Sequence, residues 1–234
     1  MRTRYLLIFV ALVWALHAAS PPAQPAVSPD EALARLAAGN ARFRDGAPSR
    51  PNQDAARRVE TATHGQQPFA IVLSCSDSRV PAEVVFDQGI GDLFVIRVAG
   101  NVAAGNETAS VEYGAKHLGA TVCVVLGHTS CGAVKAALDG ARLEGDLAKL
   151  IAEVAPAAER TKKAAPSLTG DALLTAAVET NVWLSIENLF HRSEVLRARV
   201  ASGELRVVGA VYDLATGEVR WLGVHPDQKR LLGG

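Results

Sequence analysis

Cysteine is scarce in this sequence, which contains only three, at Cys75, Cys123 and Cys131. A disulfide-stapled domain usually has a dense and even-numbered set of cysteines, so this protein is not built on a disulfide framework. Cys123 lies inside the apolar run TVCVVLG and is predicted to be a buried core residue. Cys75 and Cys131 lie in polar segments that follow apolar runs, and they need another explanation.

The sequence also lacks an excess of charge of either sign. Lysine and arginine together number 24, aspartate and glutamate number 24, and no run of basic residues occurs. Nucleic-acid-binding proteins usually carry a concentrated basic patch, so a nucleic-acid partner is not expected. Hydrophobic residues make up 49% of the chain and charged residues 21%, a balance typical of globular rather than disordered proteins.

Long apolar runs are absent beyond the first residues. Arg2 and Arg4 precede the apolar stretch 5–16, which is shorter than the roughly 20 residues that span a bilayer. Small residues follow, and this order is typical of a cleavable signal peptide, which we predict over 1–20; the alternative is an uncleaved membrane anchor. A cleaved signal predicts an exported, periplasmic protein with no membrane segment in its mature form. A Pro/Ala-rich tether is predicted over 21–29.

The remaining residues, 30–234, alternate between strand and helix patterns. Continuous runs of Val, Ile and Leu predict buried strands at 69–74, 93–98, 121–127, 205–213 and 218–224. Helical patterns predict helices at 30–44, 107–118, 131–140, 143–165 and 170–201. A polar, proline-containing segment up to Gln67 separates the first helix from the first strand. This order predicts a single α/β domain with a mainly parallel central β-sheet, an antiparallel edge strand, helices on both faces and an N-terminal helical arm.

Two of the predicted strands end in segments that carry reactive side chains. The sequence SCSDSR follows the first strand, and GHTSCG follows the third. Ligands of such sheets bind beyond the carboxyl ends of the strands, so these two segments are expected to lie close together. Cys131 also lies at the start of a predicted helix, where the helix dipole favours a thiolate.

Together the two segments offer two thiols and one imidazole, from Cys75, Cys131 and His128. This donor set suits tetrahedral Zn²⁺, and structural zinc sites normally have a fourth Cys or His ligand. Only three such residues are expected here, which leaves a fourth position for water or for Asp77. Each residue alone has an ordinary explanation, and Asp77 with Arg79 could be a surface ion pair of little energy. The convergence of the two segments favours a metal site.

Other reactions that use similar residues do not fit the spacing. Phosphatase loops place more residues between their cysteine and arginine than the three that separate Cys75 from Arg79, and they are richer in glycine. The C-x-x-C pair of thiol redox proteins is absent, as are the H-x-E and P-C-x-x-C motifs of zinc deaminases. The G-x-S-x-G motif of hydrolases is absent as well. These four reaction classes are therefore excluded.

The motifs CSDSR and GHTSCG resemble those of the β-class carbonic anhydrases, whose signatures are C-x-D-x-R and H-x-x-C. The resemblance covers nearly the whole mature chain, through EALARLAAGNARF, DQGIGDLFVIRVAGN, ASVEYGAKHLG and LRVVGAVYDLATGEVRWL. Two linked motifs in the same order, with this much agreement around them, make the match specific.

The resemblance implies a function and a set of site residues. The implied ligands of one catalytic Zn²⁺ per chain are Cys75, His128 and Cys131. Asp77 and Arg79 would form a dyad beside the metal. The residues implied around the substrate pocket are Gln66, Phe94 and Tyr113. The expected reaction is the reversible hydration of CO2 to bicarbonate and a proton, by attack of zinc-bound hydroxide with help from the dyad.

Members of this family assemble from dimers, so the resemblance also implies a homodimer or a multiple of one. Two other functions stay open: the same zinc chemistry on carbonyl sulfide or carbon disulfide, and a non-catalytic zinc-binding scaffold. A structural zinc site needs neither Asp77 nor Arg79, which disfavours the scaffold. In the family, the counterpart of Asp77 lies either on zinc or against the arginine. Val72, where a closed-site subgroup has tryptophan, favours the second, open form.

Overall fold

The order of the strands determines where this protein can bind a ligand. The computed structural model describes residues 27–233, and its five strands are β1 (Ala70–Ser74), β2 (Leu93–Arg97), β3 (Val122–His128), β4 (Arg206–Tyr212) and β5 (Val219–Gly223). They form one sheet in the order β2-β1-β3-β4-β5. Neighbouring strands run parallel except β4 and β5, which are antiparallel. The mainly parallel sheet with an antiparallel edge strand is confirmed.

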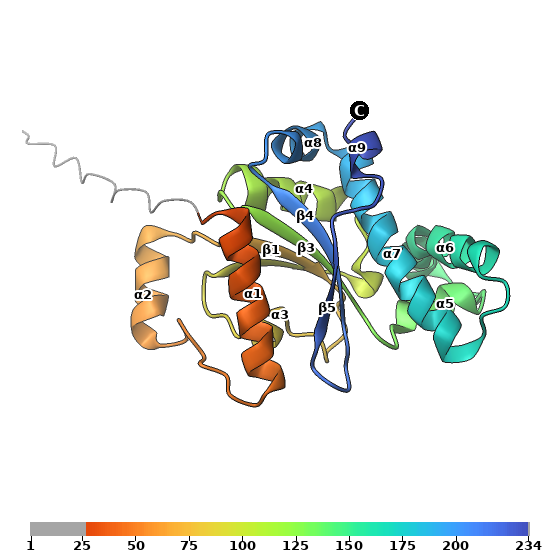
Figure 1. Cartoon of the computed structure of the whole chain (residues 1–234), viewed down its shortest axis with the longest axis horizontal. Helices are drawn as coiled ribbons and strands as arrows, with labels where there is room; N and C mark the ends of the chain where they lie inside the picture. Colours follow the sequence, from red (N-terminus) through yellow and green to blue (C-terminus); the bar gives the residue numbers. More distant parts are fainter. Residues whose placement is uncertain (1–26, 234) are drawn as a thin grey trace, which may run out of the picture.

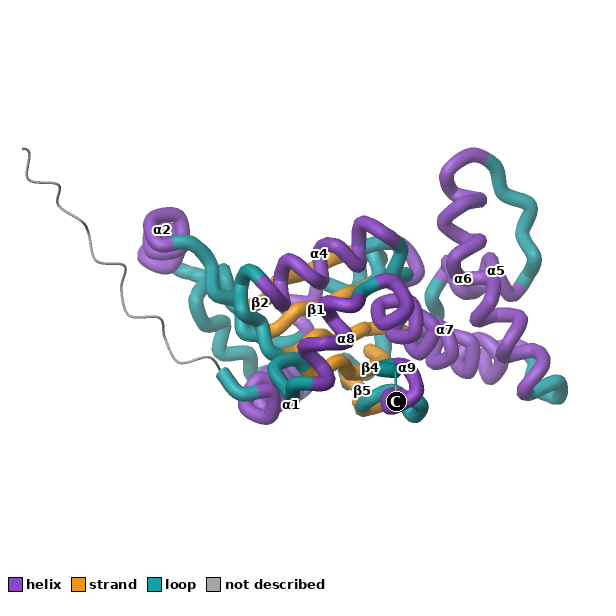
Figure 2. The backbone as a smooth tube through the Cα atoms, turned by 90° about the horizontal axis from the view of Figure 1, so that it is seen from above, coloured by secondary structure: helices purple, strands orange, loops and turns teal. Residues whose placement is uncertain are grey.

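Helices cover both faces of this sheet (Figure 1). They are α1 (Pro29–Arg44), α2 (Ala55–His64), α3 (Ala82–Val85), α4 (Gly105–Lys116), α5 (Gly132–Leu138), α6 (Gly145–Ala164), α7 (Gly170–Arg192), α8 (Glu194–Ala201) and α9 (Gln228–Leu231). Helices α1 and α3 pack on one face, whereas α4 to α8 pack on the other. Seen from above, the sheet lies between α1 and α4 (Figure 2).

The central strand β1 explains why the sequence shows a continuous apolar run rather than alternation. Ile71 and Leu73 contribute to the core under α4 to α8, whereas Ala70 and Val72 contribute to the core under α1 and α3. All four side chains are fully buried. A strand covered on both faces has no polar side, and its apolar run must end where the strand leaves the core. That end is Ser74, directly before the polar segment that contains Cys75.

The polar, proline-containing segment between the first predicted helix and the first predicted strand contains a helix, α2, which sequence reasoning missed. Asp54 caps this helix by accepting a hydrogen bond from the backbone N–H of Arg57 at 2.8 Å. None of the residues of α2 is buried, and its largest apolar side chain, Val59, is 66% exposed. A helix without a buried stripe leaves no apolar periodicity in the sequence, so only its cap could have indicated it.

The helix predicted over 170–201 is two helices, because the chain leaves helical geometry at Ser193. This residue has φ −122° and ψ 108°, and its hydroxyl accepts a hydrogen bond from the backbone N–H of Leu196 at 3.0 Å. Ser193 therefore ends α7 and caps α8 at the same time. The apolar spacing continues across this break, which is why the periodicity alone predicted one helix.

The fold begins before the boundary expected from composition. Ser28 caps α1 by accepting a hydrogen bond from the N–H of Glu31, and Pro29 is the first residue of the helix. Residues 27–29 thus belong to the folded part rather than to the tether predicted over 21–29. The predicted signal peptide, 1–20, lies outside the described residues. Within residues 27–233, no helix has both the length and the apolar character needed to cross a bilayer.

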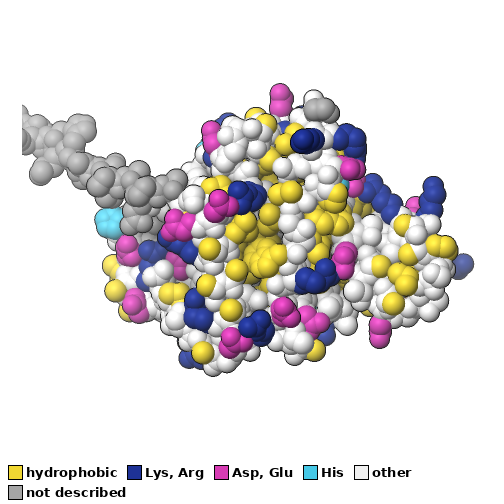
Figure 3. Space-filling view, in the orientation of Figure 1, with side chains coloured by type: hydrophobic (Ala, Val, Ile, Leu, Met, Phe, Trp, Pro, Cys, Tyr) yellow, Lys and Arg dark blue, Asp and Glu magenta, His cyan; other side chains and the backbone are white. Residues whose placement is uncertain are grey.

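One face of the molecule carries a patch of apolar side chains between α1 and the edge strand β5 (Figure 3). A groove in this patch is lined by Leu33 and Ala37 from α1 and by Val208 and Trp221 from the sheet. Large apolar surface beside a sheet edge is often covered by another protein surface.

Candidate metal centre

The predicted ligands lie at the point where the strand order of the sheet reverses direction. From β1 the chain passes to β2 on one side, whereas β3 and β4 lie on the other side. In open parallel sheets, the crevice at such a point is the usual ligand-binding position. Cys75 follows β1 directly, and His128 is the last residue of the neighbouring β3. The topology therefore brings the two motif-bearing segments to the same crevice.

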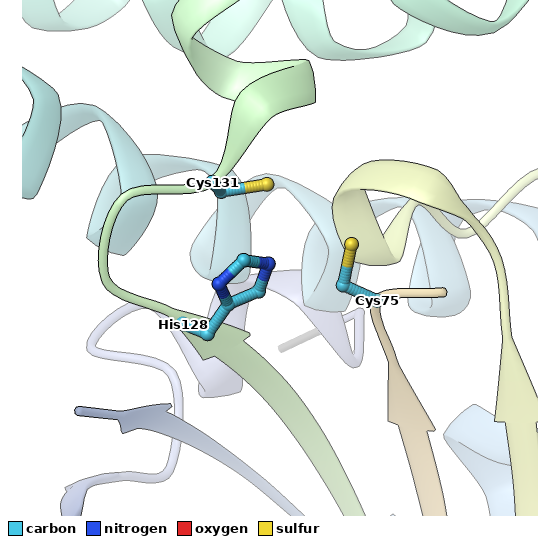
Figure 4. A group of neighbouring side chains, drawn as sticks. All are labelled: Cys75, His128 and Cys131. Atoms are coloured by element: carbon cyan, nitrogen blue, oxygen red, sulfur yellow. The ribbon is translucent and has the colours of Figure 1, made fainter. Parts of the chain in front are cut away.

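The structure brings Cys75, His128 and Cys131 together as the sequence predicts. Their ligand atoms, two sulfurs and one ring nitrogen, all lie within 4.8 Å of one another. The imidazole at the end of β3, the thiol of Cys131 at the start of α5 and the thiol of Cys75 after β1 converge on one point (Figure 4). The three residues are 5%, 0% and 1% exposed. Two sulfurs and one imidazole at these separations fit the donor set and dimensions of a zinc site.

The surroundings of His128 fix which of its ring nitrogens faces the thiols. Nδ1 lies 2.9 Å from the carbonyl oxygen of Thr129, so it carries the hydrogen and donates it there. Thr129 is itself fixed, because its N–H donates to the carbonyl of Tyr212 and its hydroxyl accepts from the N–H of Leu214. Nε2 is left as a buried acceptor without a hydrogen-bond partner among the described residues. A buried acceptor without a partner is costly, and a metal ion at this position would satisfy it.

The thiols of Cys75 and Cys131 cannot both be ionised unless a cation lies near them. The hydrogen bond from Cys131 lowers the pKa of Cys75 to about 4, although burial opposes this shift. The same pairing, together with burial, raises the pKa of Cys131 well above its ordinary value. The backbone amides of Ala133 and Val134, at the start of α5, lower the pKa of Cys131 only in part. The thiolate predicted at Cys131 from the helix dipole therefore forms first at Cys75, and a second thiolate requires a nearby cation.

Asp77 and Arg79 form a two-pronged ion pair at the exposed side of the three ligands. Nε of Arg79 donates to Oδ1 of Asp77 at 2.9 Å, and Nη2 donates to Oδ2 at 2.7 Å. The backbone N–H of Arg79 donates to Oδ1 as well. These contacts hold the pKa of Asp77 well below its usual range. Oδ2 of the ionised carboxylate lies 3.9 Å from Nε2 of His128, next to the ligand atoms.

Two groups that support the cluster were not singled out from the sequence. Arg97, at the end of β2, donates to the backbone carbonyls of Cys75 and Asp77 at 3.2 and 2.6 Å. The backbone N–H of Gly100 donates to the sulfur of Cys75 at 3.3 Å. The Gly-Asn pair at Gly100 and Asn101 is a turn signal in the sequence, but it does not indicate what the turn contacts.

The three residues implied around the substrate pocket do not lie beside the ligands of their own chain. Phe94 pairs with Ile71 in the sheet, four residues before Cys75, which corresponds to about 13 Å along a strand. Tyr113 packs at a tilt against Phe94, with ring centroids 5.9 Å apart, and is 49% exposed. Gln66 is exposed and precedes β1, at the end of the strand opposite to Cys75.

Comparisons with known proteins agree on one family. The family model described as "Carbonic anhydrase" matches residues 70–219. The chain is 38% identical over 197 residues to carbonic anhydrase 2 of Mycobacterium tuberculosis, covering 82% of this chain and 92% of that protein. It is 39% identical over 199 residues to the carbonic anhydrase of Mycolicibacterium smegmatis, covering 83% and 94%. A solved structure from work on two tetrameric β-carbonic anhydrases of Sordaria macrospora superposes with a TM-score of 0.66 at 26% identity, covering 72% and 87%.

Removing the thiol of Cys75 should disrupt metal binding, whereas removing the thiol of the core residue Cys123 should not. We expect Cys75→Ala to weaken zinc affinity by more than about 100-fold, because even residues around metal ligands are worth about 10- to 100-fold. Cys123→Ala is the matched control, since Cys123 is equally buried but lies outside the cluster. Metal analysis measures the zinc content of both variants, and competition with a chelator measures their zinc affinity. Equal zinc content in the two variants would contradict the ligand assignment.

Proposed function

Because the chain belongs to the β-class carbonic anhydrases, we propose that it catalyses the reversible hydration of CO2 to bicarbonate and a proton. One zinc ion per chain would be held by Cys75, His128 and Cys131. The observation that carries this proposal is the convergence of two buried thiols on an imidazole nitrogen that has no hydrogen-bond partner among residues 27–233. When bound there, zinc supplies a Lewis acid that lowers the pKa of a coordinated water from 15.7 to about 7, equivalent to roughly 12 kcal/mol.

We assign two tasks to the ion pair of Asp77 and Arg79. The carboxylate lies next to the ligand atoms and remains ionised at neutral pH, so it can accept a hydrogen bond from the reacting water and orient it. Arg79 binds both carboxylate oxygens and thereby holds Asp77 beside the metal position rather than on it. With Asp77 held in this way, the three ligands would leave room for water at a bound metal, as in the open form of the site.

The roles assigned to Asp77 predict a variant that binds metal but turns over slowly. Asp77→Ala should lower kcat/KM for CO2 hydration by about 100-fold or more, with zinc content unchanged, because it removes only the orienting acceptor. Asp139→Ala is the control, since Asp139 forms an exposed ion pair with Lys135 on α5. Stopped-flow assays with a pH indicator measure both variants. Wild-type activity in Asp77→Ala would refute the assigned role.

We further propose that the chain works as a homodimer or a multiple of one, with Gln66, Phe94 and Tyr113 serving the site of a neighbouring copy. Within one chain these residues are too far from the ligands to share a pocket with them. The groups closest to the ligands, at the exposed side, are instead the charged side chains of Asp77 and Arg79. A nonpolar substrate such as CO2 needs an apolar wall, which a second copy could supply. The tetrameric state of the Sordaria macrospora proteins supports an assembly of this kind.

Mixed assemblies test this arrangement directly. Cys75→Ala chains lack a metal site, and Phe94→Ala chains lack the aromatic wall, so each variant alone should be impaired. Co-expressed with different affinity tags and purified as mixed assemblies, the two variants should recover activity, because the intact metal site then faces an intact Phe94. Mixed assemblies no more active than Phe94→Ala alone would show that Phe94 acts within its own chain. Full activity of Phe94→Ala alone would show that Phe94 does not contribute to the pocket.

One assay separates the proposed reaction from its rivals. Stopped-flow measurements on the zinc-loaded protein with CO2, carbonyl sulfide and carbon disulfide should show CO2 as the preferred substrate. Preference for one of the sulfur compounds would assign the same metal chemistry to a related molecule. A protein that holds zinc but turns over none of the three would be a scaffold.

We also propose that the protein is exported to the periplasm, on the grounds of the sequence pattern of residues 1–20. Cell fractionation with mass analysis of the mature N-terminus tests this. A full-length chain retained in the membrane fraction would contradict a cleaved signal.

A further inference from the structure

We propose that Asn181 and Ser185, on α7, are positioning residues that strengthen metal binding by holding the backbone N–H of Gly100 against the sulfur of Cys75. The proposal rests on the metal site inferred above and extends it to a helix that carries none of its ligands. It assigns a role to two fully buried polar side chains that the packing of an apolar helix does not require.

The hydrogen bond from Gly100 to Cys75 acts on a metal ligand. It joins the amide nitrogen to the sulfur over 3.3 Å in a buried setting. An N–H directed at a thiolate stabilises its charge and fixes the direction of its lone pairs. Hydrogen bonds to ligand sulfurs also reduce the charge that they donate to a metal. The placement of this one amide therefore influences both the affinity and the electronic properties of the site.

The amide is placed by a turn that would not keep its shape unaided. Gly100 has φ 75° and ψ 16°, and the next residue, Asn101, has φ 45°. Two consecutive residues in the left-handed region are unfavourable, and the second is not glycine. A side chain on Gly100 would place its Cβ 3.0 Å from Val154 and 3.2 Å from Ala133, so the turn is also tightly enclosed. A conformation of this kind persists where neighbouring groups hold it.

Helix α7 provides those groups. Nδ2 of Asn181 donates to the carbonyl of Gly100 at 2.7 Å, and Oγ of Ser185 donates to the carbonyl of Asn101 at 2.9 Å. The two side chains are four residues apart and hence lie on the same face of the helix. They are 1% and 2% exposed, so water does not compete for these bonds. Together they fix two successive carbonyls and, through them, the backbone that presents the amide of Gly100.

The helix is itself a firm support because it lies directly on the sheet. A Cβ added at Gly127 in β3 would lie 2.7 Å from a methyl group of Val182, and one added at Gly209 in β4 would lie 2.8 Å from its other methyl group. Val182 is fully buried. Glycines in two neighbouring strands thus allow α7 to approach the sheet closely at Val182. Asn181 precedes this contact residue in the sequence, and Ser185 follows it. The sheet therefore fixes the position of α7, and α7 fixes the position of the turn. The same sheet positions Cys75 and His128.

The test separates a positioning role from a merely structural one. Ser185→Ala removes one of the two bonds to the turn, and Thr161→Val is the matched control. Thr161 is 4% exposed, and its hydroxyl bonds to Ala157 and Thr180, away from the turn. Both variants lose a buried hydroxyl, so both should unfold at a lower temperature. Only Ser185→Ala should also weaken zinc affinity, by about 10-fold, measured by competition with a chelator.

A spectroscopic measurement gives a second readout that does not depend on activity. In the cobalt-substituted protein, a sulfur that loses its hydrogen bond donates more charge, so the sulfur-to-cobalt absorption band of Ser185→Ala should move to longer wavelength. The band of Thr161→Val should match that of the wild type. Asn181→Ala should behave as Ser185→Ala does, and if it fails to fold, the Ser185 variant alone decides. A Ser185→Ala protein with the affinity and spectrum of Thr161→Val would overturn the proposal, whereas a wild type that binds no zinc would overturn the metal site itself.

Discussion

Two buried thiols held side by side cannot both ionise unless a cation neutralises them, and this constraint accounts for most of what surrounds Cys75 and Cys131. The first proton leaves Cys75 readily because Cys131 donates a hydrogen bond to it, and the second is retained for the same reason. The fold adds an imidazole whose free nitrogen is buried and has no hydrogen-bond partner among the described residues. A divalent cation resolves both problems at once, since it stabilises the second thiolate and gives Nε2 of His128 a partner.

The groups that brace the cluster form hydrogen bonds to the backbone beside the ligands or to the ligand atoms themselves. Arg97 donates to the carbonyls of the segment that carries Cys75, Thr129 accepts from His128, and Gly100 donates to a sulfur. Hydrogen bonds of this kind orient the ligand side chains around a metal position. The one strong ion pair nearby, between Asp77 and Arg79, is internally neutral and lies at the exposed side.

Much of this site was predictable from the sequence, because it follows from strand ends. The runs before Cys75 and His128 are apolar throughout, which indicates strands covered on both faces, and the carboxyl ends of such strands meet. Helix α2 was not predictable from periodicity, since it buries nothing, and neither was the break at Ser193, across which the apolar spacing continues. The contacts of Asn181 and Ser185 join residues more than 80 positions apart. No local pattern encodes such a pairing, which becomes visible only once the sheet has placed both partners.

The burial of the site falls steeply from the ligands to the ion pair, and this gradient bears on the proposal that a second copy contributes to the site. The ligand side chains are at most 5% exposed, the side chain of Asp77 is 18% exposed, and that of Arg79 is 56% exposed. The exposed side of the ligands is therefore bordered by the polar Asp77–Arg79 ion pair rather than by an apolar surface. The sheet register places Phe94 beside Ile71, away from the ligands, and the exposed ring of Tyr113 packs at a tilt against Phe94 rather than against the ligands. In the proposed assembly, the half-buried ring of Phe94 and the exposed ring of Tyr113 would provide an apolar wall for the site of a second copy, and the same contact would cover the exposed ring.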